Sequence, residues 1–167
     1  MGDNIIKMLE LLKELYHYGV SNNPNNKEIE EILQEMYLLK KRAENYVQNK
    51  NSLIELIINY NTDEFNVGGV SFYMPDDFIY LDDYICIASD GAGEHIAIDK
   101  KSGLIYNLLD DDSKIKIANS GENFIEKLVE IGKVNFSKKS KENNLLETLN
   151  KFSENLDAQK FYFSLMC

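Results

Sequence analysis

Cysteine, histidine and long apolar runs are all scarce in this chain. The 167 residues include two cysteines, Cys86 within a predicted strand and Cys167 at the last position. Two distant cysteines cannot form the disulfide framework of a small secreted protein, so we expect a reduced, cytoplasmic protein. A chain of this length buries a sizeable core without disulfide support, so we expect one domain.

The lack of long apolar runs bears on membranes. A transmembrane helix needs about 20 consecutive apolar residues, and no run in the sequence approaches that length. The first residues form an acidic amphipathic pattern, which differs from the charged-then-apolar pattern of a signal peptide. We therefore expect no membrane partner.

Basic residues are scarce where acidic residues are dense. The net charge is -10, and residues 61–112 hold 12 acidic and 2 basic side chains, whereas the flanking parts nearly balance. Phosphate binding depends on clustered Lys and Arg, so nucleic acid is not an expected partner. A basic protein surface is the natural complement of such a segment. The alternative is that the acidic excess serves solubility alone.

The most definite local pattern is a series of short strands. Residues 84–99 contain two alternating apolar runs, which flank a glycine-containing turn. A third apolar run covers residues 104–109, and residues 115–120 lead into a helical pattern at 122–131. This order predicts an antiparallel meander that is followed by a helix.

Helical periodicity flanks the strands on both sides. The first helix is expected to end near Tyr18, with Gly19 as its left-handed C-terminal residue, and Asn26 to cap a second helix whose apolar stripe reaches Val47. A third helix is expected at residues 53–60. Near the end of the chain, apolar residues recur at helical spacing at Leu145, Leu146, Leu149, Phe152 and Leu156.

These patterns together predict an α+β fold. It consists of N-terminal helices, a central, mostly antiparallel sheet of about four to six strands, and C-terminal helices. No internal repeat or second domain is visible in the sequence. We expect residues 133–167 to form a helical addition that packs on the core.

Residues 84–131 resemble the SUKH superfamily, which contains fungal cell-wall-assembly regulators and many bacterial immunity proteins. The matching motifs are IASDG (87–91), Gly93, IAID (96–99), GLIY (103–106) and IANS (117–120), followed by FIEKL (124–128). Residues 53–61 are similar to the family helix that ends in Tyr-Asn. Many members carry an acidic-histidine element where this chain has NLLDDD (107–112), so the role of that histidine is not carried over. The resemblance implies one SUKH-like domain over residues 1–167, with its core at about 27–132.

No motif predicts a catalytic or cofactor site. Residues 91–93 lack the third glycine of a dinucleotide loop, and no Lys-Ser/Thr follows them as in a P-loop. Cys86 has apolar neighbours and no adjacent base, so we expect a packed core residue and no nucleophile. We therefore expect no enzyme, no catalytic residue and no cofactor.

The acidic groups do not predict a metal site either. Strand alternation puts His95 and Asp99 on one face and Glu94 on the other, so these side chains do not converge. A solvent-facing pair of His95 and Asp99 remains open, as an ordinary polar pair or as two ligands. The run 110–112 lacks the alternating acidic positions of a calcium loop, and we expect an exposed turn there.

Aromatic residues interleave with acids in the middle of the chain. This mixture is typical of a protein-binding rim with aromatic anchors. The candidate partner-binding residues are Asp63, Glu64, Phe72, Tyr73, Asp76, Asp77, Phe78, Tyr80, Asp82, Asp83, Asp110, Asp111 and Asp112. The alternative is that Phe72 and Phe78 cover the sheet while the acids keep the loops solvated.

Two functions are compatible with these observations. The SUKH resemblance implies a non-catalytic bacterial immunity protein, which binds a cognate toxin encoded by a neighbouring gene and occludes its basic active-site or substrate surface. The same family also implies an intracellular regulatory or scaffolding module. An immunity protein predicts one tight partner, and a scaffold predicts several weaker ones.

Overall fold

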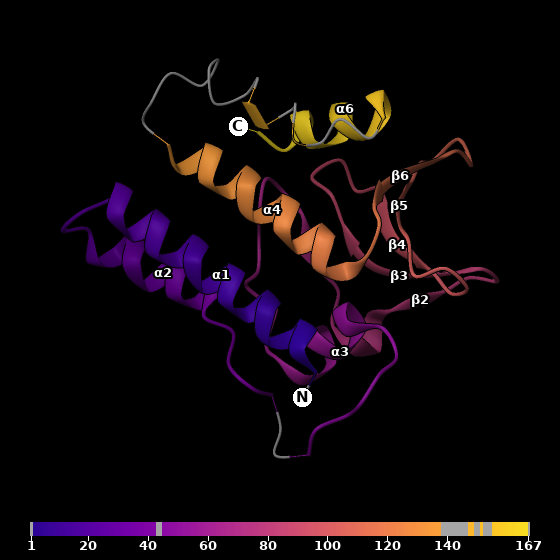
Figure 1. Ribbon diagram of the computed structural model, residues 1–167, viewed down its shortest axis with the longest axis horizontal. Helices are drawn as coiled ribbons and strands as arrows, with labels where there is room; N and C mark the ends of the chain where they lie inside the picture. The colour runs from indigo at the N-terminus through magenta and orange to yellow at the C-terminus, as the bar shows by residue number, and fades with distance from the viewer. Residues whose placement is uncertain (1, 43–44, 138–146, 149–150, 152–154, 167) are drawn as a thin grey trace.

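The computed structural model describes residues 2–42, 45–137, 147–148, 151 and 155–166. Its helices are α1 (Asp3–Asn22), α2 (Lys27–Tyr37), α3 (Ser52–Asn59), α4 (Gly121–Phe136) and α6 (Leu156–Ser164) (Figure 1). Its strands are β1 (Ser71–Phe72), β2 (Ile79–Tyr80), β3 (Tyr84–Ser89), β4 (His95–Asp99), β5 (Ile105–Leu108) and β6 (Lys114–Ala118). A short 3-10 helix, η1 (Pro75–Asp77), separates β1 from β2. The predicted α+β fold is confirmed.

All six strands belong to one antiparallel sheet. Strands β3 to β6 form the predicted meander, and their order in the sheet is their order in the chain. Strands β1 and β2 both pair with β3, so they lie end to end along the same edge. The sheet is therefore five strands wide, with two short strands sharing one border.

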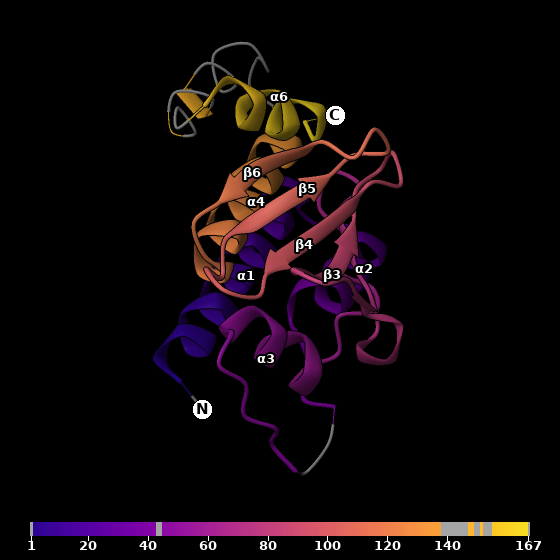
Figure 2. The ribbon, with the colours of Figure 1, turned by 90° about the vertical axis from the view of Figure 1, so that its right-hand side faces the viewer.

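The described helices leave one face of the sheet uncovered. Figure 1 shows the sheet nearly edge-on with α1, α2 and α4 on one side, and in Figure 2 strands β3 to β6 lie in front of the helices. The inward side chains of β4 and β5, Ile96, Ile98 and Ile105, are buried in one core cluster with residues of α1, α3 and α4. In the described part of the chain, no helix has both the length and the apolar character that crossing a bilayer requires.

Aspartates shape each hairpin turn of the meander. Asp90 Oδ1 accepts hydrogen bonds from the backbone N–H groups of Ala92 and Glu94, and Asp99 Oδ1 accepts them from Lys101 and Ser102. In the last turn, Asp111 Oδ1 accepts from the N–H of Ser113. In turns of this kind, a side-chain oxygen takes the place of a backbone carbonyl oxygen as the hydrogen-bond acceptor. Part of the acidic excess in residues 61–112 therefore serves the fold.

The first helix is longer than predicted. It continues through Gly19 to Asn22, so the prediction of an end near Tyr18 is wrong. Gly19 is buried, and a Cβ atom at this position would lie 2.8 Å from Leu33 Cδ1 of α2 and 3.3 Å from the Phe136 ring of α4. The glycine allows two helices to approach and does not end a helix.

The second helix is shorter than predicted. Asn26 caps it as expected, because its side chain accepts a hydrogen bond from the N–H of Ile29. The helix ends at Tyr37, so the predicted apolar stripe to Val47 is wrong. The chain pairs there with the end of α3: Arg42 N–H donates to Asn59 O (2.8 Å), and Asn61 N–H donates to Lys40 O (2.7 Å). Backbone hydrogen bonds to residues 59–61 therefore replace helical hydrogen bonds at residues 40–42.

The C-terminal helix α6 covers the outer edge of β6. A register shift in the β5–β6 pairing leaves Ile117 without a partner, and its carbonyl oxygen accepts from Tyr162 Oη (2.7 Å) and Lys127 Nζ (3.1 Å). Bulges and covering helices both protect sheet edges from pairing with other chains. The predicted helical residues Leu145, Leu146, Leu149 and Phe152 lie outside the described residues.

Helices α1 and α4 approach each other closely at Gly132. A Cβ atom at this position would lie 2.8 Å from both Cδ atoms of Leu15, which is fully buried. An exposed Gly→Ala substitution within a helix usually stabilises it by about 1 kcal/mol. At Gly132 the leucine cannot move into solvent, so the added methyl group overpacks the contact.

We expect Gly132→Ala to lower the free energy of unfolding by about 1–3 kcal/mol, because overpacking a core has this cost. The measurement is chemical denaturation. In a Leu15→Ala background the clash is absent, so the same Gly132→Ala change should be neutral or stabilising. A Gly132→Ala protein that is more stable than wild type in the presence of Leu15 would contradict this packing.

A buried carboxylate fixes the segment before α3. Glu55 is 8% exposed, and it accepts hydrogen bonds from the Tyr46 hydroxyl and from the N–H of Asn49 (2.9 Å). These two hydrogen bonds, that from Tyr46 first, lower the pKa of Glu55 below its ordinary value of 4.5. Ionised Glu55 therefore stabilises the folded state.

The contribution of Glu55 should depend on pH with a defined sign. Its pKa is lower in the folded protein, so its stabilisation is complete above pH 4.5 and is lost as the pH falls through the folded value. We expect Glu55→Gln to be less stable than wild type at pH 7, and the difference to shrink below pH 4.5. Urea unfolding across this range measures it, with Glu31→Gln on the exposed side of α2 as the control. A difference independent of pH would rule out this role.

Candidate protein-binding surface

The predicted rim follows one border of the sheet. The segment from β1 through η1 and β2 runs along β3, with Phe72 opposite Ala88 and Ile79 opposite Cys86. Because the strands are only two residues long, most of this segment is loop. Its side chains therefore divide between the core and solvent, and pairing with β3 decides which way each one points.

Two predicted aromatic anchors belong to the core. Phe72 and Phe78 are each 8% exposed, and the Phe72 ring lies 4.7 Å from that of Phe65. Both rings are therefore inaccessible to a partner. This agrees with the alternative interpretation of the sequence, in which Phe72 and Phe78 cover the sheet. Tyr73 is half-buried, and its hydroxyl lies 2.7 Å from His95 Nδ1. His95 pairs with this tyrosine and Asp99 with its own turn, so the suggested His95–Asp99 pair is not formed.

The remaining residues of the segment form an exposed surface, which we call the acidic ridge. It consists of Met74, Asp76, Asp77, Ile79, Tyr80, Leu81, Asp82 and Asp83, all of them exposed. Tyr80 is 68% exposed and Leu81 is 42% exposed. Met74, Ile79 and Leu81 were not among the predicted partner-binding residues. The available signal was the run Ile79-Tyr80-Leu81, because an alternating strand cannot bury three consecutive apolar side chains.

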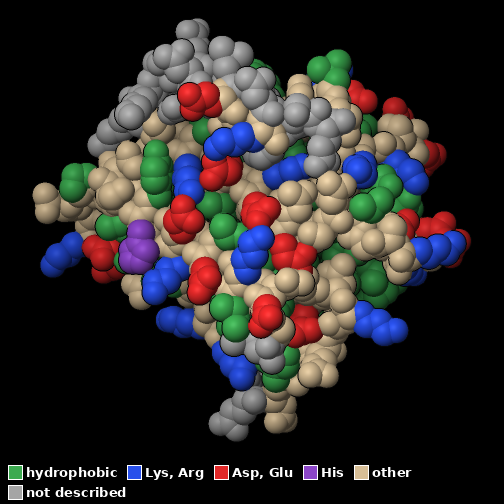
Figure 3. Space-filling model, in the orientation of Figure 1, with side chains coloured by type: hydrophobic (Ala, Val, Ile, Leu, Met, Phe, Trp, Pro, Cys, Tyr) green, Lys and Arg blue, Asp and Glu red, His purple; other side chains and the backbone are tan. Residues whose placement is uncertain are grey.

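Most carboxylates of the acidic ridge lack an ion-pair partner among the described residues. Within the described part of the chain, Asp76, Asp77 and Asp82 make no ion pair, and Asp83 makes one exposed pair with Lys101 at 3.6 Å. The helical face in Figure 3 differs, because acidic and basic side chains are interspersed there. Pairs such as Lys7–Glu126 and Lys133–Glu14 link α1 to α4 on that face. Lys100 also donates to the carbonyl oxygens of Leu81 and Asp82. The ridge therefore keeps an excess of negative charge, four carboxylates against the ammonium groups of Lys100 and Lys101.

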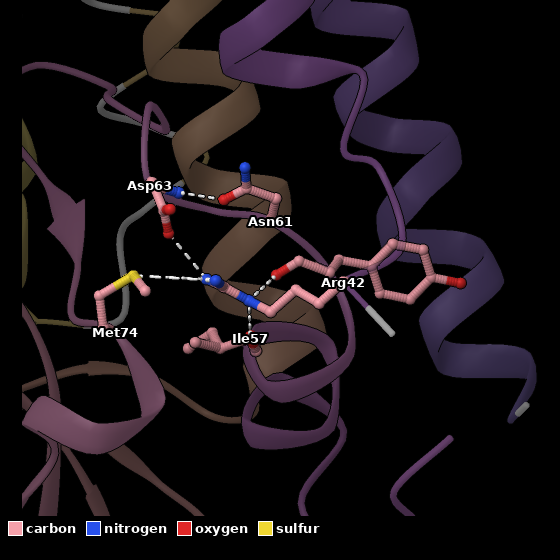
Figure 4. Close-up of polar contacts among 6 residues, drawn as sticks. Arg42, Ile57, Asn61, Asp63 and Met74 are labelled. Carbon is pink, nitrogen blue, oxygen red and sulfur yellow. Dashed lines mark hydrogen bonds and ion pairs between the residues drawn. The ribbon is translucent and has the colours of Figure 1, made fainter. Parts of the chain in front are cut away.

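Asp63 is compensated by an internal cation. Arg42 Nη2 lies 2.8 Å from Asp63 Oδ1, and Arg42 Nε donates to Tyr60 O (2.8 Å) and Ile57 O (3.3 Å) (Figure 4). The guanidinium also contacts Met74 Sδ at 3.7 Å. Arg42 thus links the end of α3 to the start of the ridge. Glu64, the next predicted residue, lines a separate hollow with Glu35 and Lys40.

The run 110–112 lies at the other end of the meander from Asp82 and Asp83. It forms the β5–β6 turn, where Asp112 has a left-handed backbone (φ 62°). Asp110 and Asp112 are exposed and line a groove on the open face of the sheet, and Leu81 of the ridge lines the same groove. The predicted acids therefore form two groups, which this groove connects.

The open face between these groups is aromatic. The Tyr84 and Tyr106 rings meet edge to face with centroids 5.8 Å apart, and Lys114 Nζ lies 5.1 Å from each centroid. The Lys114 ammonium also donates to the Tyr84 hydroxyl. Sequence periodicity places these residues on one face but does not show this cluster, because the three belong to different strands. An ammonium above a tyrosine ring is a cation–π contact.

Cys86 and the acidic side chains offer no assembled reactive site. Cys86 is fully buried, as predicted, and burial raises the pKa of its thiol, which disfavours the nucleophilic thiolate. Among the described residues, no three His, Cys, Asp or Glu side chains converge as they would around a metal ion. The exposed ridge and the open face are therefore the features that call for a function.

Comparisons with known proteins do not assign a family. No protein-family model matches the chain, and no curated protein or solved structure matches it either. The SUKH resemblance of residues 84–131 stays a prediction from the sequence.

Asp63 has an internal ion-pair partner and Asp77 of the ridge has none among the described residues, so their substitution should affect the free energy of unfolding differently. We expect Asp63→Asn to lower the free energy of unfolding by about 0.5–1 kcal/mol, because it weakens a partly exposed ion pair. Asp77→Asn breaks no internal contact and should change it by less than about 0.5 kcal/mol. Thermal or urea unfolding in low salt tests the pair. Equal effects of the two substitutions would contradict the assignment of Asp63 to the fold.

Proposed function

We propose that this protein is a non-catalytic immunity protein, which binds a cognate toxin and covers its basic active-site or substrate surface. The observation that carries the proposal is the acidic ridge, where exposed apolar side chains lie among four exposed carboxylates, three of which make no ion pair with a described residue. The SUKH resemblance of the meander supports it independently, because immunity proteins are frequent in that family.

The ridge has the composition of an interface and not of an ordinary solvated loop. Tyr80, Leu81 and Met74 are exposed by 68%, 42% and 41%, and large exposed apolar groups that border polar residues are typical of protein-binding sites. Tyrosine is enriched among residues that dominate binding energy. We assign the anchoring role to Tyr80, the most exposed of these side chains.

The carboxylates supply the other half of the proposal. The ammonium of Lys100 binds the carbonyl oxygens of Leu81 and Asp82, whereas the carboxylates of Asp76, Asp77 and Asp82 make no ion pair with a described residue. Such charges attract a basic partner over about 8 Å at physiological ionic strength and mainly accelerate association. Buried apolar contacts then slow dissociation. The two kinds of ridge residue should therefore affect different rate constants.

The decisive experiment measures the binding of the whole protein to the catalytically disabled product of its neighbouring gene. We expect a tight one-to-one complex. Asp76→Lys/Asp77→Lys should slow association about 10-fold or more at low salt, with a smaller effect at high salt. Tyr80→Ala should weaken binding about 30-fold, or about 2 kcal/mol, mainly through faster dissociation.

Matched controls lie on the helical side of the molecule. Glu28→Lys/Glu31→Lys makes the same charge change on exposed positions of α2, and Phe163→Ala removes an aromatic ring that is 53% exposed on α6. Both controls should bind like wild type. If the neighbouring product does not bind, or if controls and ridge variants weaken binding equally, the proposal is wrong. Capture of several weak partners in place of one would favour the scaffolding alternative.

A further inference from the structure

A groove with a volume of about 550 Å³ lies on the open face of the sheet. Its residues come from the β2–β3, β3–β4 and β5–β6 turns and from the strands between them. In Figure 2 this face of β3 to β6 points toward the viewer, and α1 and α4 lie behind it. The groove is therefore open to a partner that approaches the sheet.

The groove is lined by both apolar and acidic side chains. Leu81, Leu108 and Leu109 supply apolar wall, and a long aliphatic side chain can pack along such a surface. Glu94, Asp110 and Asp112 supply three carboxylates. No ion pair with a described residue engages any of these three, so their charge is available to a partner.

Lys114 lines the same groove but is engaged elsewhere. Its ammonium donates to the Tyr84 hydroxyl and lies 5.1 Å from the centroids of Tyr84 and Tyr106. The aromatic side of the groove thus already holds a cation of this chain. The groove keeps an excess of two negative charges, three carboxylates against one ammonium.

We propose that this groove receives an arginine side chain of the bound toxin. The aliphatic part would lie against the leucines, and the guanidinium would reach Glu94, Asp110 and Asp112. Guanidinium suits this site better than ammonium, because it presents five donors in a plane to several carboxylates and is more weakly hydrated. This inference rests on the proposed function, and it adds to the acidic ridge a specific receptor for one side chain.

The groove can be tested without the toxin. The probe is N-acetyl-arginine amide, titrated into the ¹⁵N-labelled whole protein and followed by NMR. We expect weak binding, on the order of millimolar as suits a small ligand, with the largest shifts at the amides of Gly93, Leu109 and Ser113. N-acetyl-citrulline amide, which has nearly the same shape without the charge, should not bind. Equal shifts with both probes would overturn the proposal.

Variants with opposite expected effects separate charge from folding. Asp110→Asn/Asp112→Asn should weaken probe binding about 10-fold, because two of the three carboxylates are lost. Lys114→Met removes the competing cation and should tighten binding several-fold, which a misfolded protein cannot do. Glu28→Gln/Glu31→Gln on the exposed side of α2 should leave probe binding unchanged. Equal probe affinity in wild type and in the groove variants would contradict the assignment of the groove as an arginine receptor.

The same variants test the arginine receptor separately from the proposed immunity role. In the toxin complex, Asp110→Asn/Asp112→Asn should speed dissociation about 10-fold, while ridge charge changes slow association. A toxin that binds wild type and this double variant equally would overturn the arginine receptor and leave the immunity role intact. A probe that binds while the neighbouring product does not would refute the immunity role, and the groove would still stand as an arginine-binding site.

Discussion

Burial of the meander on a single face is the constraint on which the rest of the structure depends. Ile96, Ile98 and Ile105 point into a core that α1, α3 and α4 complete. That core requires α1 and α4 to come close together, and the small residues Gly19 and Gly132 make this approach possible. Because α1, α3 and α4 complete this core on one face of the sheet, the other face is not covered by the described helices and carries the candidate site.

Closing the edges of the sheet is the second consequence of this arrangement. On one edge, the bulge at Ile117 turns a carbonyl outward, where Tyr162 and Lys127 satisfy it beneath α6. On the other edge, η1 interrupts pairing between two strands of two residues each. An interrupted edge does not invite strand pairing by another chain. Recognition on that border should therefore rely on side chains and not on strand addition.

The acidic excess of residues 61–112 has three separate uses. Asp90, Asp99 and Asp111 accept backbone N–H groups in the turns. Asp63 binds Arg42 and helps to hold the connection before α3. Apart from the exposed Asp83–Lys101 pair, the ridge and groove carboxylates make no ion pair with a described residue, and they give the open border and face their negative character. Net charge alone does not distinguish these uses, because each depends on which group lies within hydrogen-bonding distance.

The sequence by itself determined the local elements of this protein. Alternation and turn residues predict β3 to β6, and Asn26 predicts the start of α2, because these signals act between residues close in the chain. Tertiary structure alone decided the end of α2, the continuation of α1 through Gly19, and the burial of Phe72 and Phe78 beside an exposed Tyr80. It also placed Leu81 in one groove with Asp110 and paired Asp63 with Arg42. These outcomes depend on contacts between segments far apart in the chain, and local periodicity carries no information about such contacts.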